Sequence, residues 1–166
     1  MASTPPLNVL FLCTGNSARS VMAEVLLNTL GAGRFKAYSA GSQPAGRVNP
    51  FTLHQLSTNG HLVGELRSKS WDEFAGIDAP KMDLIITVCD NAAGELCPVW
   101  PGHPATAHWS FEDPAAFQGP DEEKRARFAA TYRQIAARVR LLIGVPVESL
   151  ERLALEQQAR SIGKSS

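Results

Sequence analysis

Hydrophobic and polar positions follow one another in blocks that switch between a strand pattern and a helix pattern. Residues 8–12 form a short apolar run, and residues 84–88 form an uninterrupted one of the kind found in strands buried on both faces. Residues 35–40 predict a further strand. A fourth is expected at 106–109, inside the stretch 97–120, which holds five prolines and otherwise favours loops.

Helical periodicity fills the intervals between these strands. Residues 18–30 carry apolar side chains at three- and four-residue steps, and residues 49–59 begin with an Asn-Pro pair typical of a capped helix start. Residues 121–143 open with acidic side chains and predict a long helix. Its apolar face is formed by Phe128, Tyr132, Ile135, Val139 and Leu142. Strands that alternate with helices predict an α/β fold with a parallel sheet and helices on both faces.

The length of 166 residues predicts one domain. We expect residues 1–146 to form a single catalytic domain and residues 147–166 a C-terminal appendage, helical at first and disordered at its end. The chain shows no signal-peptide pattern and no run long enough to span a membrane. A cytoplasmic protein is therefore expected, with its three cysteines reduced at rest.

The charges balance: Lys plus Arg and Asp plus Glu each count 16. No broad positive field is therefore expected to attract nucleic acid or an anionic membrane. Any anion must be recognised locally. The four histidines show no metal-ligand spacing, so we expect no bound metal and no cofactor.

The junction between the first predicted strand and the first predicted helix carries the candidate chemistry. It reads, in order, Cys13, Thr14, Gly15, Asn16, Ser17, Ala18, Arg19 and Ser20. Backbone N–H groups of such a loop can converge on a tetrahedral oxyanion, helped by the N-terminus of the helix. The same field would lower the pKa of the Cys13 thiol, while Arg19 would bind two anion oxygens and Ser17 and Ser20 would hydrogen-bond the thiolate or brace the loop.

A cysteine that merely ends a buried strand is the simpler alternative, since an isolated C-x5-R match arises easily by chance. The strand, the glycine-containing loop and the helix all occur at the required places, which favours the functional interpretation. A nucleotide-binding P-loop is disfavoured because its G-x-x-x-x-G-K-[ST] pattern is absent.

The loop resembles that of the low-molecular-weight protein tyrosine phosphatase superfamily, whose C-x5-R-S segment lies near the N-terminus. Further segments similar to the family's landmarks follow in order: Met22–Glu24, Tyr38–Gly41, Asn49–Pro50, a strand ending at Cys89, and Asp113–Pro114. The resemblance covers roughly residues 7–143 and implies a three-layer fold with a four-stranded parallel sheet of flavodoxin-like order.

Two branches of this superfamily share the loop. In the phosphatase branch, aromatic residues follow the Asp-Pro motif and line an aryl pocket, whereas here Ala115 follows Pro114. The other branch resembles arsenate reductases, which need additional thiols, and Cys89 and Cys97 supply them. The spacing between these two cysteines is one residue longer than in the best-known relay pattern. Ala18 stands where many relatives carry another cysteine.

The resemblance implies a mechanism. Cys13 attacks arsenate held by the loop and Arg19, Asp113 acts as general acid, and Cys89 and Cys97 then relay a disulfide to thioredoxin. Glutathione with glutaredoxin becomes the expected reductant if Cys97 is not the last thiol. The alternative is a phosphatase with Cys13 as nucleophile and Asp113 as acid.

Two further hypotheses come from the sequence. By resemblance, Glu24, Asn16, Ser39 and Asp72 would brace the loop or hold a cation, as similar residues do in some relatives. A non-enzymatic reading also stays open, in which the loop senses an oxyanion and the appendage docks to a partner.

Overall fold

The computed structural model describes residues 6–13, 15–74, 76, 78–88, 105–109 and 111–144. The elements in this part of the chain are β1 (Leu7–Cys13), α1 (Arg19–Leu30), β2 (Phe35–Gly41), α2 (Pro50–Thr58), the 3-10 helix η1 (Trp71–Phe74), β3 (Leu84–Thr87), β4 (Ala105–His108), the 3-10 helix η2 (Pro114–Ala116) and α4 (Asp121–Ile143). The four predicted strands and the three predicted helices are thereby confirmed, with bounds that differ by about one residue. The appendage expected at 147–166 lies outside the described residues.

The strands form one sheet in the order β2-β1-β3-β4, and every neighbouring pair is parallel. This confirms the predicted four-stranded sheet of flavodoxin-like order. In the register, Cys13 pairs with Gly41, Leu12 with Thr87, and Thr87 with His108. All four strands therefore end at one edge. The chain runs from β1 to β2 on one side and then to β3 on the other, so this edge includes a topological switch point, where α/β proteins bind ligands.

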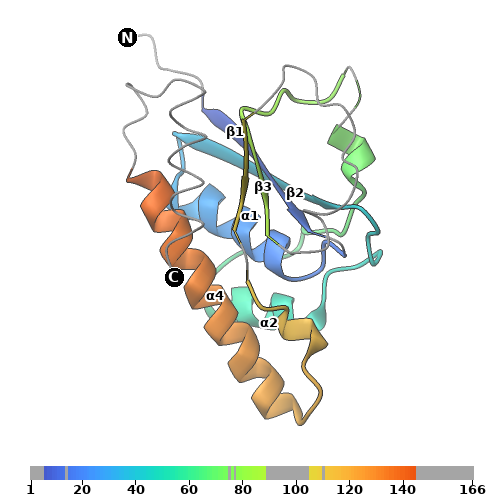
Figure 1. Cartoon of the computed structure of the whole chain (residues 1–166). Helices are drawn as coiled ribbons and strands as arrows, with labels where there is room; N and C mark the ends of the chain where they lie inside the picture. The colour runs from blue at the N-terminus through green and yellow to red at the C-terminus, as the bar shows by residue number, and fades with distance from the viewer. Residues whose placement is uncertain are drawn as a thin grey trace.

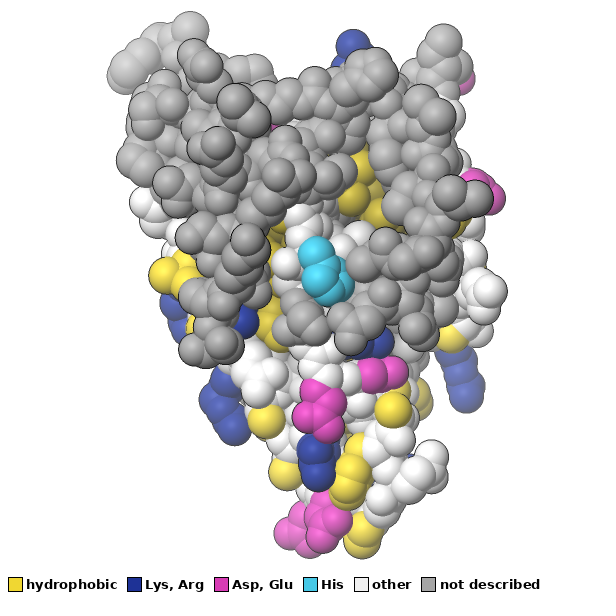
Figure 2. Space-filling model, in the orientation of Figure 1, with side chains coloured by type: hydrophobic (Ala, Val, Ile, Leu, Met, Phe, Trp, Pro, Cys, Tyr) yellow, Lys and Arg dark blue, Asp and Glu magenta, His cyan; other side chains and the backbone are white. Residues whose placement is uncertain are grey.

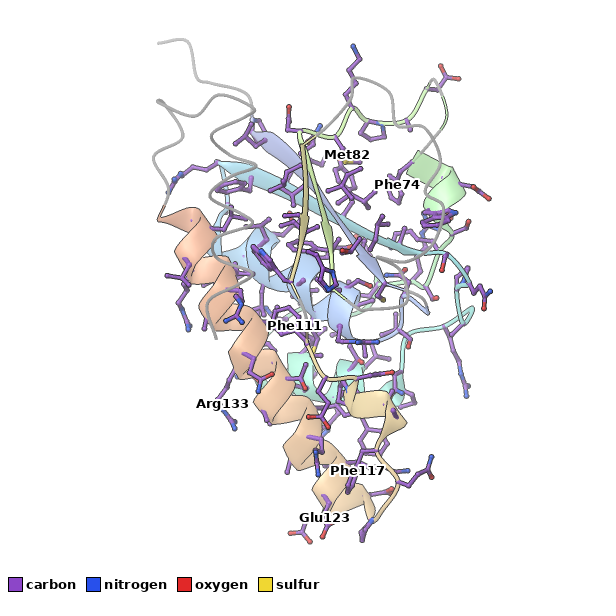
Figure 3. All side chains as sticks on the ribbon, in the orientation of Figure 1. Phe74, Met82, Phe111, Phe117, Glu123 and Arg133 are labelled. Carbon is purple, nitrogen blue, oxygen red and sulfur yellow. The ribbon has the colours of Figure 1, made fainter. Side chains whose placement is uncertain are left out.

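The two faces of the sheet have separate cores. On one face, α1 packs against β1 and β2, and α4 packs against α1 and α2. Figure 1 shows α4, in orange, running past α1 and α2 on the same side of the sheet, with η1, in green, on the other side. On that second face Phe74 and Met82 pack with Leu10, Leu12 and Ile85. Figure 3 shows Phe74 and Met82 near each other, away from α4.

Local chemistry explains where the helices begin and which faces they bury. Asn49 caps α2 by accepting a 2.9 Å hydrogen bond from the Phe51 N–H, with Pro50 in the first turn. The α4 helix begins with three acidic residues and has Arg140 in its last turn, which suits the helix dipole. Its buried side chains are Phe128, Thr131, Ile135, Ala136, Val139 and Leu142.

Two helix residues at the margin of the core lie close to the ring of His61. Tyr132 is half-buried, and its hydroxyl oxygen lies 2.8 Å from the Nε2 of His61. Thr29, in the last turn of α1, is exposed, and its Oγ1 lies 3.3 Å from the Nδ1 of the same ring.

None of the helices in the described part of the chain combines the length and the apolar content needed to cross a bilayer.

Candidate active site

Cys13 is the last residue of β1 and is 3% exposed. The chain turns back on it at Asn16, whose φ of 46° lies in the left-handed region that asparagine tolerates better than most residues. This turn brings the Asn16 N–H to 3.2 Å from the Cys13 Sγ. The Ser20 Oγ lies 2.9 Å from the same sulfur. Thr14, the remaining residue of the turn, lies outside the described residues.

The side chain of Asn16 fixes the orientation of Ser20. Its Nδ2 donates a 2.8 Å hydrogen bond to the Ser20 Oγ, so the serine hydroxyl can direct its own hydrogen at the sulfur. Both side chains are fully buried. N–H and O–H donors aimed at the sulfur favour the thiolate over the thiol. The geometry is therefore suited to a nucleophilic Cys13.

The carbonyl groups of the loop are held from outside. The Gly15 carbonyl accepts a 2.9 Å hydrogen bond from the Ser68 Oγ. The Ser17 carbonyl accepts from the Asn49 N–H at 3.0 Å and from the Thr52 Oγ1 at 2.8 Å. The backbone of Ser17 is thus bonded to the start of α2. These bonds turn carbonyl oxygens away from the loop interior, as an anion-binding nest requires.

Arg19 and Asp113 meet although they lie far apart in the sequence. The Arg19 Nη1 donates a 3.0 Å hydrogen bond to the Phe111 carbonyl, and its Nη2 lies 3.5 Å from the Asp113 Oδ2. The other carboxylate oxygen of Asp113 accepts from the Ala115 N–H at 3.0 Å and caps η2. Asp113 therefore does cap a turn, while its second oxygen faces the arginine of the Cys13 loop. Its side chain is 39% exposed, so a substrate can reach it.

Of the four residues expected to brace the loop or hold a cation, Asn16 belongs to the loop itself, and Ser39 and Glu24 bond to each other. Ser39 donates a 2.7 Å hydrogen bond to the Glu24 Oε1, and Asn16 has the contacts given above. Asp72 is exposed on η1, where its backbone N–H bonds to the Ser70 Oγ. Within the described residues, no group of three His, Cys, Asp or Glu side chains could hold a metal ion.

Sequence reasoning missed Lys69, whose ammonium lies 3.7 Å from the Glu24 Oε1. Its backbone N–H also donates a 2.8 Å hydrogen bond to the Asn16 Oδ1, across 53 positions. Burial lowers the pKa of the Lys69 ammonium below its ordinary value, an effect that the Glu24 carboxylate opposes in part. No motif around Lys69 could have revealed it, because the contact is made only by the fold.

Cys89 and Cys97 lie outside the described residues. The described chain reaches Val88, a buried residue whose N–H donates a 2.8 Å hydrogen bond to the Leu12 carbonyl. The residue before Cys89 thus lies at the sheet edge where β1 ends. On the face shown in Figure 2, the described basic and acidic side chains are interspersed and form no single patch of one sign.

The sheet order and the C-x5-R loop at its carboxyl edge are features of a known class. The chain belongs to the low molecular weight phosphotyrosine protein phosphatase family, whose model matches residues 8–159. Its relatives include proteins named arsenate reductase from Halalkalibacterium halodurans and Bacillus subtilis, each 37% identical over 132 residues that cover 80% of this chain and 91% of the relative. The solved arsenate reductase from Archaeoglobus fulgidus is 34% identical, with a TM-score of 0.59, and the match covers 79% of this chain and 98% of that one.

Replacing Ser20 tests the hydrogen bonds to the sulfur. We expect Ser20→Ala to raise the pKa of the Cys13 thiol by about one to two units, because a hydrogen bond to a charged group contributes roughly 1.5–3 kcal/mol. The measurement is the pH dependence of iodoacetamide alkylation in a Cys89→Ser/Cys97→Ser background, where Cys13 is the one remaining thiol. Ser57→Ala, on the exposed end of α2, is the matched control. An unchanged midpoint in Ser20→Ala would show that the serine does not stabilise the thiolate.

Proposed function

We propose that this protein is an arsenate reductase in which the thiolate of Cys13 attacks the arsenic atom. The observation that carries the proposal is the Cys13 sulfur itself, which lies 3.2 Å from the Asn16 N–H and 2.9 Å from the Ser20 Oγ inside the C-x5-R loop. Relatives at 37% identity carry the name arsenate reductase, which supports arsenate as the substrate over phosphate.

The first step forms a bond between sulfur and arsenic. The loop N–H groups and Arg19 hold three arsenate oxygens, and the fourth oxygen leaves as Cys13 attacks. Asp113 lies beside Arg19 and supplies the proton that lets this oxygen depart as water. For this role Arg19 turns part of its guanidinium from the Phe111 carbonyl to the anion, and it keeps Asp113 near the departing oxygen.

The second step moves two electrons from sulfur to arsenic. The Cys89 thiolate attacks the Cys13 sulfur, and the S–As bond breaks with its electron pair on arsenic. Arsenite is released, and a Cys13–Cys89 disulfide remains on the protein. Cys97 then attacks Cys89 and releases Cys13 as a thiolate. The resulting Cys89–Cys97 disulfide is reduced by the dithiol of thioredoxin. Such a cycle suits the reducing cytoplasm, where the three thiols would be kept reduced between turnovers.

The aromatic residues around Asp113 argue against a phosphotyrosine pocket. Trp109 is fully buried against Phe11, at 6.0 Å between ring centroids. Phe111 is buried and lies 5.7 Å from the guanidinium carbon of Arg138. Phe117 lies 4.5 Å below the guanidinium of Arg127, and Figure 3 shows it beside the first turns of α4, apart from Phe111. Trp109 and Phe111 are thus buried in packing and half-buried Phe117 lies against Arg127, which disfavours an aryl pocket built from these three rings.

A coupled assay tests the proposal. Arsenate is added to the full-length protein with thioredoxin, thioredoxin reductase and NADPH, and NADPH consumption is followed. We expect arsenate-dependent turnover that far exceeds hydrolysis of p-nitrophenyl phosphate by the same preparation. No turnover with arsenate, together with brisk hydrolysis of the aryl phosphate, would make the protein a phosphatase. Turnover only with glutathione and glutaredoxin would show that these, and not thioredoxin, are the reductant.

The third thiol has its own test. Cys97→Ser is expected to produce one arsenite per chain and then stop, because Cys13 and Cys89 supply the two electrons but the disulfide cannot be passed on. Arsenite is quantified after mixing with excess arsenate, with and without the thioredoxin system. Normal cycling of Cys97→Ser with thioredoxin would remove Cys97 from the relay.

A further inference from the structure

Residues 67–70, which we call the strap, contact the Cys13 loop and the sheet edge at the same time. Toward the loop, the Ser68 Oγ donates to the Gly15 carbonyl at 2.9 Å and the Lys69 N–H donates to the Asn16 Oδ1 at 2.8 Å. Toward the sheet, the Gly41 N–H donates to the Lys69 carbonyl at 2.9 Å. The strap therefore connects the Cys13 loop to the end of β2.

The side chain of Lys69 folds back under the strap. Its Nζ donates a 3.0 Å hydrogen bond to the Arg67 carbonyl and lies 3.7 Å from the Glu24 Oε1. The side chain is 9% exposed and that of Glu24 is 16% exposed. Glu24 belongs to α1 and also accepts from Ser39 of β2, so this ion pair connects the strap to both elements beside the loop.

Both side chains are largely withdrawn from water, and charges in such places cost free energy unless each has a partner of opposite sign. The other charged groups that act on Lys69 are Arg67 and Glu73. These two are exposed and bind each other through two hydrogen bonds of 2.6 and 3.0 Å. Glu24 is therefore the counterion of Lys69. Through this ion pair and its hydrogen bond to the Arg67 carbonyl, the ammonium connects the strap to α1.

We propose that Lys69 is a positioning residue for the nucleophile: its largely buried side chain fixes the strap, the strap fixes Asn16, and Asn16 presents its N–H and Ser20 to the Cys13 sulfur. Asn16 is fully buried and has a positive φ, so it needs support from outside the loop to keep this conformation. The inference rests on the proposed role of Cys13 and adds to it a residue 56 positions away that touches neither substrate nor sulfur.

The test is the alkylation profile of Cys13 in the Cys89→Ser/Cys97→Ser background. We expect Lys69→Met to shift the pH midpoint of alkylation upward by about half a unit or more, a threefold or greater loss of thiolate below the midpoint. In the chain with all three cysteines, the same substitution should lower kcat. Lys36→Met, an exposed lysine of β2, is the control and should leave both values unchanged.

Lys69→Met leaves Glu24 without its counterion, so we pair it with the double variant Lys69→Met/Glu24→Gln, which removes both charges. A raised midpoint in the double variant supports positioning, because no unpaired carboxylate remains to repel the thiolate. If the double variant had the same midpoint as the Cys89→Ser/Cys97→Ser parent, the proposal would be overturned. The shift in Lys69→Met would then come from the unpaired charge of Glu24 alone. Alkylation needs no arsenate, so this result stands apart from whether arsenate is the substrate.

Discussion

Cys13→Ser is expected to abolish arsenate reduction, with turnover lower by roughly three orders of magnitude or more. A serine hydroxyl is a far weaker nucleophile at neutral pH, and its oxygen cannot form the disulfide that delivers two electrons to arsenic. The loss should appear in kcat with every reductant, thioredoxin or glutathione. The measurement is arsenite formation over long incubations at high enzyme concentration.

We expect the Cys13→Ser substitution to have little effect on the stability of the fold. Cys13 is 3% exposed, and a serine there keeps a polar atom close to the Asn16 N–H and the Ser20 hydroxyl. We therefore expect a folded protein that still binds an oxyanion, which phosphate-dependent thermal stabilisation would report. If Cys13→Ser retained substantial reductase activity, another cysteine would have to be the nucleophile.

Arg19→Gln should have the second-largest effect, a loss of about a hundredfold or more in kcat/KM. Arg19 supplies the guanidinium of the loop, and its Nη2 lies 3.5 Å from Asp113, so the change should weaken anion binding and release the proposed general acid together. The loss should divide between KM and kcat. Steady-state kinetics over a wide range of arsenate concentrations measures both.

Two further variants interpret this result. Arg34→Gln makes the same change before β2, at the opposite edge of the sheet, and should leave kcat/KM unchanged. Asp113→Asn keeps the cap on η2 but cannot supply a proton, so it should lower kcat with little change in KM. Equal losses in kcat/KM for Arg19→Gln and Arg34→Gln would show that Arg19 has no special part in the site.

The elements of the fold could be predicted because each depends on neighbouring residues. The uninterrupted apolar run at 84–88 predicts the buried β3, and the Asn49–Pro50 pair marks the start of α2. The Cys13 loop could be found for the same reason, since its thiol, turn and guanidinium lie within seven consecutive residues. Backbone geometry at a strand-to-helix junction then determines much of the site.

The support of that loop could not be predicted, because it comes from residues distant in sequence. Ser68 and Lys69 contact Gly15 and Asn16 across 53 positions, and neither belongs to a recognisable motif. The carbonyl of Phe111 holds Arg19 across 92 positions by a backbone group, which no side-chain pattern reports. Such contacts follow only from how the strap and the segment after β4 pack at the sheet edge.

A single turnover without added reductant tests the central claim most directly. Fully reduced protein is mixed with excess arsenate, and both arsenite and remaining thiols are counted. The account predicts one arsenite per chain and the loss of two of the three thiols, with a disulfide located by mass spectrometry. Three intact thiols and no arsenite, in a protein that hydrolyses an aryl phosphate, would contradict it.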